Sequence, residues 1–331
     1  MPIPARFRAF RIHEENRLHR AGIQEVSLDE LTAGELVVQV AYSSVNYKDA
    51  LAGTGKGRIL RRFPLVGGID VAGHVVASSD ARFREGDGVL CCGAWLSETR
   101  DGGYAQYARL EADSTVHLPA GLDLREAMIL GTAGFTAGLA LLRMQENHQR
   151  PEQGPIAVTG ATGGVGMLAV DILTRAGYEV HAISGKPERA GFLQRVGARK
   201  VIDRHQLATG QRPLEAAIWG GAVDTVGGEM LAGLTRTTSP YGNIAVCGLA
   251  ASHELSTTVM PLILRGVSLL GVATTTPPQA QRQAVWERLG GAWKPAHLDA
   301  ICTRTVDLGG LADVFTGMLA GASFGRTLVQ V

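Results

Sequence analysis

The chain has 331 residues, 45% of them hydrophobic and 19% charged, which is the composition of a folded protein and not of a disordered one. Its 32 lysines and arginines nearly balance its 31 aspartates and glutamates, so the formal net charge of +1 provides no overall attraction for nucleic acid or for an anionic membrane. Four scattered cysteines are too few for a disulfide framework, and the length of the chain predicts two domains.

The first residues lack the apolar stretch of a secretory signal, and no later segment offers about 20 uninterrupted apolar residues. We therefore expect a cytoplasmic protein that does not cross a membrane. Up to residue 120, short β-type runs separated by turns occur at residues 36–40, 71–76, 88–90 and 104–108. This spacing predicts an irregular β-barrel domain over residues 1–125.

A helical pattern follows, and Asp123 is a suitable cap for it. From Pro155 the order strand, turn, helix repeats, with a strand at 156–159, a helix at 164–176 and a second strand at 179–183. Four further strands are predicted, at residues 200–202, 221–226, 243–247 and 267–272. Six strands joined by helices predict a doubly wound parallel sheet of the Rossmann type, an α/β fold, over residues 126–295.

The end of the chain has a different pattern. A helix through Trp286 is followed by an amphipathic stretch at 308–319 and by a last strand at 326–331. We expect residues 296–331 to return to the first domain.

A glycine turn of the form Gly160-x-x-Gly163-x-x-Gly166 comes directly after a buried strand and before a helix. Glycines let the backbone approach a pyrophosphate closely, and the unpaired N–H groups at the start of a helix favour its charge. A turn that serves only helix packing is the alternative. The residues predicted to contact the dinucleotide here are Thr162, Gly163, Gly164 and Val165.

The second strand of this domain ends in Ser184-Gly185-Lys186, and Arg204 follows the third strand. Enzymes that prefer NAD usually place an Asp or Glu about 20 residues after the glycine turn, where it binds the ribose 2′-hydroxyl. Basic side chains instead suit the 2′-phosphate of NADPH. We therefore predict NADPH as the cofactor. The alternative is that Lys186 and Arg189 are only solvent-exposed charges at the start of a helix.

Five segments of the chain occur in a characteristic order. They are 43–51 (SSVNYKDAL), 63–73 (FPLVGGIDVAG), 131–137 (GTAGFTA), 224–227 (DTVG) and 257–261 (TTVMP). Together they resemble the medium-chain dehydrogenase/reductase family, and most closely its zinc-free, quinone-oxidoreductase-like branch, which contains acryloyl-CoA reductase. The resemblance covers nearly the whole chain and implies a GroES-like β-barrel catalytic domain in addition to the Rossmann domain.

Zinc alcohol dehydrogenases of the wider family have a Cys near the first of these segments and Gly-His-Glu where this chain reads Gly68-Ile69-Asp70. A catalytic zinc needs about three ligands, which Asp70 and the distant Cys91 or Cys92 do not supply. We predict that the protein binds no metal, and stoichiometric zinc in the purified protein would contradict this.

Reduction without a Lewis acid requires a substrate that provides its own electron sink, as an activated C=C bond does. The resemblance places Tyr47 beside the nicotinamide with Asn46 nearby, and leaves open whether Tyr47 donates a proton or only positions the ligands. Lys48 and Asp49 are expected to form a structural pair. The resemblance also implies that four more residues line the nicotinamide side, namely Leu249, Leu264, Thr274 and Arg326.

The reaction expected from the resemblance is the reduction of acryloyl-CoA to propanoyl-CoA by NADPH. Arg58, Arg61 and Arg62 are candidates to bind the phosphates of coenzyme A, and a solvent-exposed basic loop is at least as good an interpretation of them. An NADPH:quinone or general enone reductase is the alternative enzyme, and an NADPH-binding sensor is the non-enzymatic alternative. We expect a homodimer through the strand at 267–272, with no nucleic-acid or membrane partner.

Overall fold

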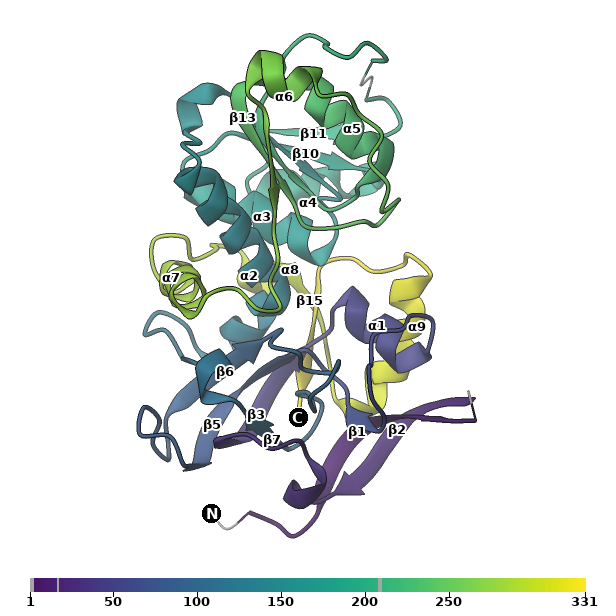
Figure 1. Ribbon diagram of the computed structural model, residues 1–331, viewed down its shortest axis with the longest axis vertical. Coiled ribbons are helices and arrows are strands. Elements are labelled where there is room, and N and C mark those ends of the chain that lie inside the picture. Colours follow the sequence, from purple (N-terminus) through teal and green to yellow (C-terminus); the bar gives the residue numbers. More distant parts are fainter. Residues whose placement is uncertain (1–2, 17, 208–209) are drawn as a thin grey trace. The chain divides into compact units, whose positions relative to one another are not determined.

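The computed structural model describes residues 3–16, 18–207 and 210–331. The chain forms two compact units, of which unit 1 comprises Met1–Thr132, Thr274–Gly290 and Leu298–Val331, and unit 2 comprises Ala133–Ala273 and Gly291–His297 (Figure 1). This division differs from the expected one, because the chain leaves unit 1 after Thr132 and returns to it for residues 274–290. A backbone hydrogen bond from Ala94 to the Thr275 carbonyl (3.0 Å) fastens that returning segment.

Unit 1 contains the predicted β-domain. Its large sheet has the order β15-β16-β3-β5-β6-β8, with β7 also paired to β3, and a smaller sheet has the order β2-β1-β4. The C-terminal strand β16 pairs antiparallel with β3, so the end of the chain (yellow in Figure 1) does return to this unit as expected. The elements of unit 1 are β1 (Phe7–Glu15), β2 (Leu18–Val26), β3 (Leu36–Ser44), α1 (Tyr47–Thr54), β4 (Leu65–Val66), β5 (Asp70–Ser78), β6 (Gly88–Cys92), β7 (Tyr107–Leu110), β8 (Val116–His117), α7 (Gln279–Leu289), α8 (Leu298–Ile301), β15 (Cys302–Val306), α9 (Leu311–Leu319) and β16 (Arg326–Gln330).

Unit 2 is built on a six-stranded sheet of order β11-β10-β9-β12-β13-β14, in which all neighbouring strands run parallel. In sequence terms this order is 3-2-1-4-5-6, the doubly wound Rossmann arrangement, which confirms the predicted fold class. The order reverses between β9 and β12, and ligands of such sheets bind beyond the carboxyl ends of the strands at that point. The elements are β9 (Ile156–Thr159), α3 (Gly164–Arg175), β10 (Val180–Ser184), α4 (Ala190–Arg195), β11 (Lys200–Asp203), β12 (Trp219–Asp224), α5 (Gly228–Thr237), β13 (Thr238–Val246), α6 (Met260–Arg265) and β14 (Ser268–Gly271).

Helix α2 (Leu124–Glu146) is interrupted at Gly131, whose φ is 49° and ψ −153°. A Cβ atom there would lie 2.5 Å from an Asp70 carboxylate oxygen and 2.6 Å from the Ser44 hydroxyl, so the position requires glycine. By length and composition α2 is apolar enough to cross a membrane, which the sequence analysis did not anticipate. However, 89% of its most apolar window is buried inside the protein, as in the core helix of a globular domain.

Candidate active site

A cavity of about 160 Å³ opens in unit 2 where the strand order reverses. The structure brings together here five of the residues predicted to bind the cofactor, namely Thr162, Ser184, Gly185, Lys186 and Arg204. Gly160, the first glycine of the predicted turn, also lines the cavity. Sequence reasoning did not identify the remaining lining residues, because they lie at strand ends or near the start of α5 outside the glycine motif. They are Thr159, Ile183, Val226 and Met230.

The glycine turn has the geometry of a phosphate-binding turn. Gly160 has a φ of +58°, a conformation that favours glycine. A Cβ atom on Gly166 would lie 2.4 Å from the Gly160 carbonyl oxygen, so the last glycine lets α3 pack directly on the turn. Gly163 precedes α3 and has no side chain to cap the helix, which leaves the first N–H groups, those of Gly164 and Val165, suited to an anion.

The end of β10 has an ordered polar arrangement. The Lys186 backbone N–H donates to the Ser184 hydroxyl (3.0 Å), and that hydroxyl lies 3.3 Å from the hydroxyl of Thr162. The Arg204 side chain crosses the strand end so closely that a Cβ atom on Gly185 would be 2.5 Å from its Nε. Glycine at 185 therefore allows a guanidinium group to line the cavity, and no Asp or Glu occurs among the described lining residues.

In unit 1, Asn46 and Tyr47 form the start of α1. The Asn46 backbone N–H donates to the Asp49 carboxylate (2.8 Å), and its side-chain Nδ2 donates to Asp70 (2.7 Å). Asn46 is thus fixed by the protein, whereas the Tyr47 side chain is 58% exposed. The expected pairing of Lys48 with Asp49 is wrong, because Lys48 pairs with Glu98. Asp49 is on the buried face of α1, and its carboxylate accepts a hydrogen bond from the Ile69 N–H (3.0 Å).

A buried polar cluster lies next to Asn46 and centres on Asp70, which sequence analysis treated only as a poor zinc ligand. The Asp70 carboxylate accepts hydrogen bonds from the Ser44 hydroxyl (2.5 Å) and from the N–H and hydroxyl of Thr132 (2.9 and 2.6 Å). Arg326, only 3% exposed, donates to the Ser44 hydroxyl (2.7 Å) and the Asn46 side-chain oxygen (3.1 Å). Burial lowers the pKa of Arg326.

The same burial acts on Asp49. Desolvation and the nearby charge of Asp70 raise the pKa of Asp49 to about 7. Two carboxyl groups and one guanidinium group therefore share the interior beneath the start of α1. This arrangement places Arg326 inside the protein, so the contact with a nicotinamide expected of it remains a prediction, and its observed role is to hold Asn46.

The remaining predicted residues lie elsewhere. Leu249, 65% exposed, follows β13, and Leu264, 61% exposed, is on α6. Thr274 belongs to unit 1, where its carbonyl lies close to Gly93. None of the three is among the described residues that line the cavity of unit 2, and their part in binding the cofactor remains a prediction.

The described residues do not fit a zinc ion. Within them, no three His, Cys, Asp or Glu side chains cluster as metal ligands would. Asp70 already accepts hydrogen bonds from hydroxyl and amide donors. Burial raises the pKa of Cys91 to about 11 and that of Cys92 well above its usual value. A thiol that stays protonated is a poor ligand, since zinc binds thiolate. The absence of a metal remains a prediction.

Two family models match the chain. The model described as "Alcohol dehydrogenase GroES-like domain" matches residues 32–120, and the one described as "Zinc-binding dehydrogenase" matches residues 164–290. These ranges fall on the β-domain of unit 1 and mainly on the Rossmann sheet of unit 2. The zinc in the second description has no counterpart among the side chains described above.

Three proteins with similar sequences or structures narrow the relationship. The putative quinone oxidoreductase YhfP of Bacillus subtilis is 45% identical, over 93% of this chain and 94% of its own length. The acrylyl-CoA reductase AcuI of Ruegeria pomeroyi is 43% identical over 96% of both chains. The yhdH oxidoreductase of Salmonella enterica, solved in complex with NADP, is 42% identical, with a TM-score of 0.94 and coverage of 98% of this chain and 99% of that one.

A solved structure of Bacillus subtilis yhfP holds NAD and has a TM-score of 0.95 at 41% identity, with coverage of 99% of this chain and 100% of that one. Structures of relatives with this fold therefore contain NADP in one case and NAD in another. The parallel sheet of order 3-2-1-4-5-6, the glycine turn and the full-length similarity agree with one another. The chain belongs to the medium-chain dehydrogenase/reductase family.

Proposed function

We propose that this chain is an NADPH-dependent oxidoreductase that reduces an activated C=C bond, and that its substrate is acryloyl-CoA. The observation that carries the cofactor assignment is the cavity at the end of β10, where Lys186 and Arg204 occur and no carboxylate lines the described wall. The positive charges of these side chains suit the 2′-phosphate of NADPH, whereas no carboxylate is present there to accept a hydrogen bond from the ribose 2′-hydroxyl of NAD. The NADP complex of the Salmonella relative supports the same choice.

The substrate assignment is supported by the Ruegeria relative, which is named an acrylyl-CoA reductase and matches this chain over nearly its full length. In the proposed reaction, acryloyl-CoA takes up one hydride at its β-carbon and one proton at its α-carbon, and the products are propanoyl-CoA and NADP⁺. NADPH, when bound, supplies the hydride. The negative charge that develops on the thioester oxygen needs hydrogen-bond donors from the protein.

Different residues of the chain bind the cofactor and position the substrate. The glycine turn and the first turn of α3 hold the pyrophosphate of the cofactor, and Ser184, Lys186 and Arg204 hold its adenosine end. The polar cluster around Asp70 fixes Asn46, and with it the start of α1, so that Tyr47 is presented from a rigid helix end. We assign Tyr47 to the substrate side, where its hydroxyl either protonates the α-carbon or orients the thioester.

The experiment is a direct assay of the purified chain. Loss of NADPH absorbance with acryloyl-CoA, together with propanoyl-CoA identified by mass spectrometry, is the expected result. A quinone assayed in parallel addresses the alternative raised by the Bacillus relative, named a putative quinone oxidoreductase. Turnover of quinones without turnover of acryloyl-CoA would replace the substrate assignment, and tight NADPH binding without any turnover would favour a sensor.

A cytoplasmic location and a homodimer belong to the same proposal. The four cysteines are free thiols, which suits a reducing compartment. Strand β14 ends the described parallel sheet, and its outer edge is suited to pairing with a second copy of itself.

A further inference from the structure

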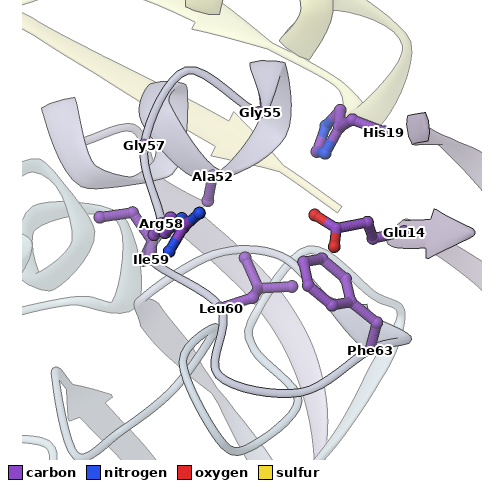
Figure 2. A pocket seen from close by; sticks show the side chains of 9 residues that line it. All are labelled: Glu14, His19, Ala52, Gly55, Gly57, Arg58, Ile59, Leu60 and Phe63. Carbon is purple, nitrogen blue, oxygen red and sulfur yellow. The ribbon is translucent and has the colours of Figure 1, made fainter. Parts of the chain in front are cut away.

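A second and larger cavity, of about 500 Å³, lies in unit 1 (Figure 2). Cavities that bind small molecules usually have volumes of about 300–1,000 Å³. Its wall consists of the end of the β1–β2 hairpin, the last part of α1 and the loop that follows α1 up to residue 63. The proposed chemistry of C=C reduction uses none of these residues.

The hairpin directs two polar side chains into this cavity. Glu14 and His19 are direct partners in the antiparallel register of β1 and β2, so their side chains lie on the same face of the hairpin. Ring nitrogen Nε2 of His19 lies 3.0 Å from the Gly53 carbonyl and donates to it, which ties the hairpin to α1. Gly55, at a φ of +70°, ends the helix, and a Cβ atom there would lie 2.7 Å from the His19 ring.

The loop supplies the opposite charge. Figure 2 shows the Arg58 guanidinium and the Glu14 carboxylate pointing into the cavity from opposite walls, with the ring of Phe63 and the side chain of Leu60 below them. Among the described residues, neither charged group has an ion-pair partner within 4.0 Å. Segment 56–62 has the sequence KGRILRR, which contains four basic residues and no acidic one. The cavity therefore combines a cationic loop, one carboxylate and an apolar floor.

These features match one end of coenzyme A. We propose that this cavity binds the adenosine 3′,5′-bisphosphate end of a coenzyme A thioester, with the phosphates on Arg58 and the basic loop. The adenine ring packs against Phe63 and Leu60, and its exocyclic amino group faces the Glu14 carboxylate. The proposal rests on the acyl-CoA substrate proposed above and extends it to the part of the substrate that does not react.

Helix α1 links this cavity to the reacting group. Tyr47 is its first residue, and Ala52 and Gly55 at its other end line the cavity. Eight helical residues span about 12 Å, so one extended ligand can contact both ends of α1 through its pantetheine arm. Binding energy from the distant nucleotide would then help to orient the thioester.

The test compares two thioesters of the same acid. Acryloyl-CoA carries the nucleotide, and acryloyl-pantetheine does not. For Arg58→Ala we expect the KM for acryloyl-CoA to rise about tenfold, since one charge-assisted hydrogen bond is lost, while the KM values for acryloyl-pantetheine and NADPH stay unchanged. Arg304→Ala, which removes an exposed arginine of β15, is the matched control and should leave all three unchanged. Equal effects of Arg58→Ala on both thioesters would overturn the proposal.

A binding measurement separates this inference from the proposed reaction. Adenosine 3′,5′-bisphosphate should bind the wild-type protein in a calorimetric titration, in the presence of saturating NADPH, and should bind Arg58→Ala and Glu14→Gln more weakly. No binding to the wild-type protein, or equal binding to all three, would refute the site. If neither thioester is reduced, the proposed function fails, and this titration still decides the occupancy of the cavity.

Discussion

The Asp70 carboxylate and the Arg326 guanidinium lie 3.9 Å apart in the interior of unit 1, where their side chains are 0% and 3% exposed. The two residues come from β5 and from the last strand of the chain, so the pair links the middle of the β-domain to its C-terminus. Ser44 lies between them and hydrogen-bonds to both. Each of these buried charges has lost its hydration and is stabilised by the opposite charge of its partner, so removal of one partner is expected to destabilise the folded protein.

Replacement of Asp70 by Asn should therefore destabilise the protein. The change removes the negative charge and leaves the buried Arg326 guanidinium without its ion-pair partner, which costs about 3 kcal/mol. Urea unfolding of the variant and the wild type measures this difference. Asp299→Asn is the control, because Asp299 pairs with Arg125 at the surface and its loss should cost less than about 1 kcal/mol. Equal effects of the two substitutions would contradict the role of the buried pair.

Asp49 should make stability depend on pH near neutrality. Its pKa is about 7 in the folded protein, whereas an aspartate in an unfolded chain has a pKa of about 3.9. The folded state therefore holds an extra proton between these values, so the contribution of Asp49 is complete below about pH 4 and is lost as the pH rises through about 7. The slope is at most about 1.4 kcal/mol per pH unit.

Urea unfolding from about pH 5 to about pH 8 tests this contribution. Asp49→Asn should flatten the decrease in stability, because the amide does not titrate. Asp313→Asn, on the exposed face of α9, is the control and should keep the wild-type slope. An unchanged slope in Asp49→Asn would show that another group is responsible.

Most of the Rossmann fold could be predicted from the sequence, because each of its strands is a short apolar run bounded by turns. The predicted strand 156–159 coincides with β9, but the strand predicted at 243–247 begins earlier, at Thr238. Pro240 and Gly242 lie inside β13, although these residue types usually mark a turn. Residues 274–290 were assigned to the wrong unit for a related reason. Pro277-Pro278 marks a break in the chain but does not indicate which domain the next helix packs against.

The two parts of the candidate site differed in how well they could be predicted. The cofactor residues from Thr162 to Arg204 lie within the first three consecutive strands of the sheet and their connections, so spacing along the chain identified them. The cluster of Asp49, Asp70 and Arg326 forms only when β16 closes on β3 and α2 breaks at Gly131. The periodicity of apolar residues does not predict contacts between segments that lie far apart in the sequence. The positioning role of these residues is therefore evident only from the structure.

Arg204 should determine the choice of cofactor. Its guanidinium lies against Gly185 at the rim of the cavity, and we expect Arg204→Ala to lower kcat/KM for NADPH about 10- to 100-fold, since a charge-assisted hydrogen bond to the 2′-phosphate is lost. The value for NADH should stay unchanged. Arg199→Ala, an exposed arginine one residue before β11, is the control for charge. Wild-type kcat/KM values that are comparable for the two cofactors would contradict the NADPH preference itself.

The protein should be a dimer through β14. This strand is last in the order of the described sheet, and its residues remain partly exposed although they belong to a parallel sheet. Apolar side chains of the neighbouring α6 are also exposed, with Ile263 at 71%, and such patches commonly mark an interface. Sedimentation velocity over a range of protein concentrations measures the state, and a single monomer species at every concentration would rule out the predicted dimer.

Tyr47→Phe separates the two roles left open for the tyrosine. The side chain is exposed, so loss of the hydroxyl should change stability by less than about 0.5 kcal/mol. If the hydroxyl donates the proton to the α-carbon, kcat for acryloyl-CoA should fall about 100-fold or more, since general acids contribute roughly that much. If Tyr47 only positions the ligands, kcat should stay within about twofold and KM should rise. Because water reaches an exposed position and can protonate an enolate, we expect the second result, and a solvent isotope effect on kcat that Tyr47→Phe abolishes would argue against it.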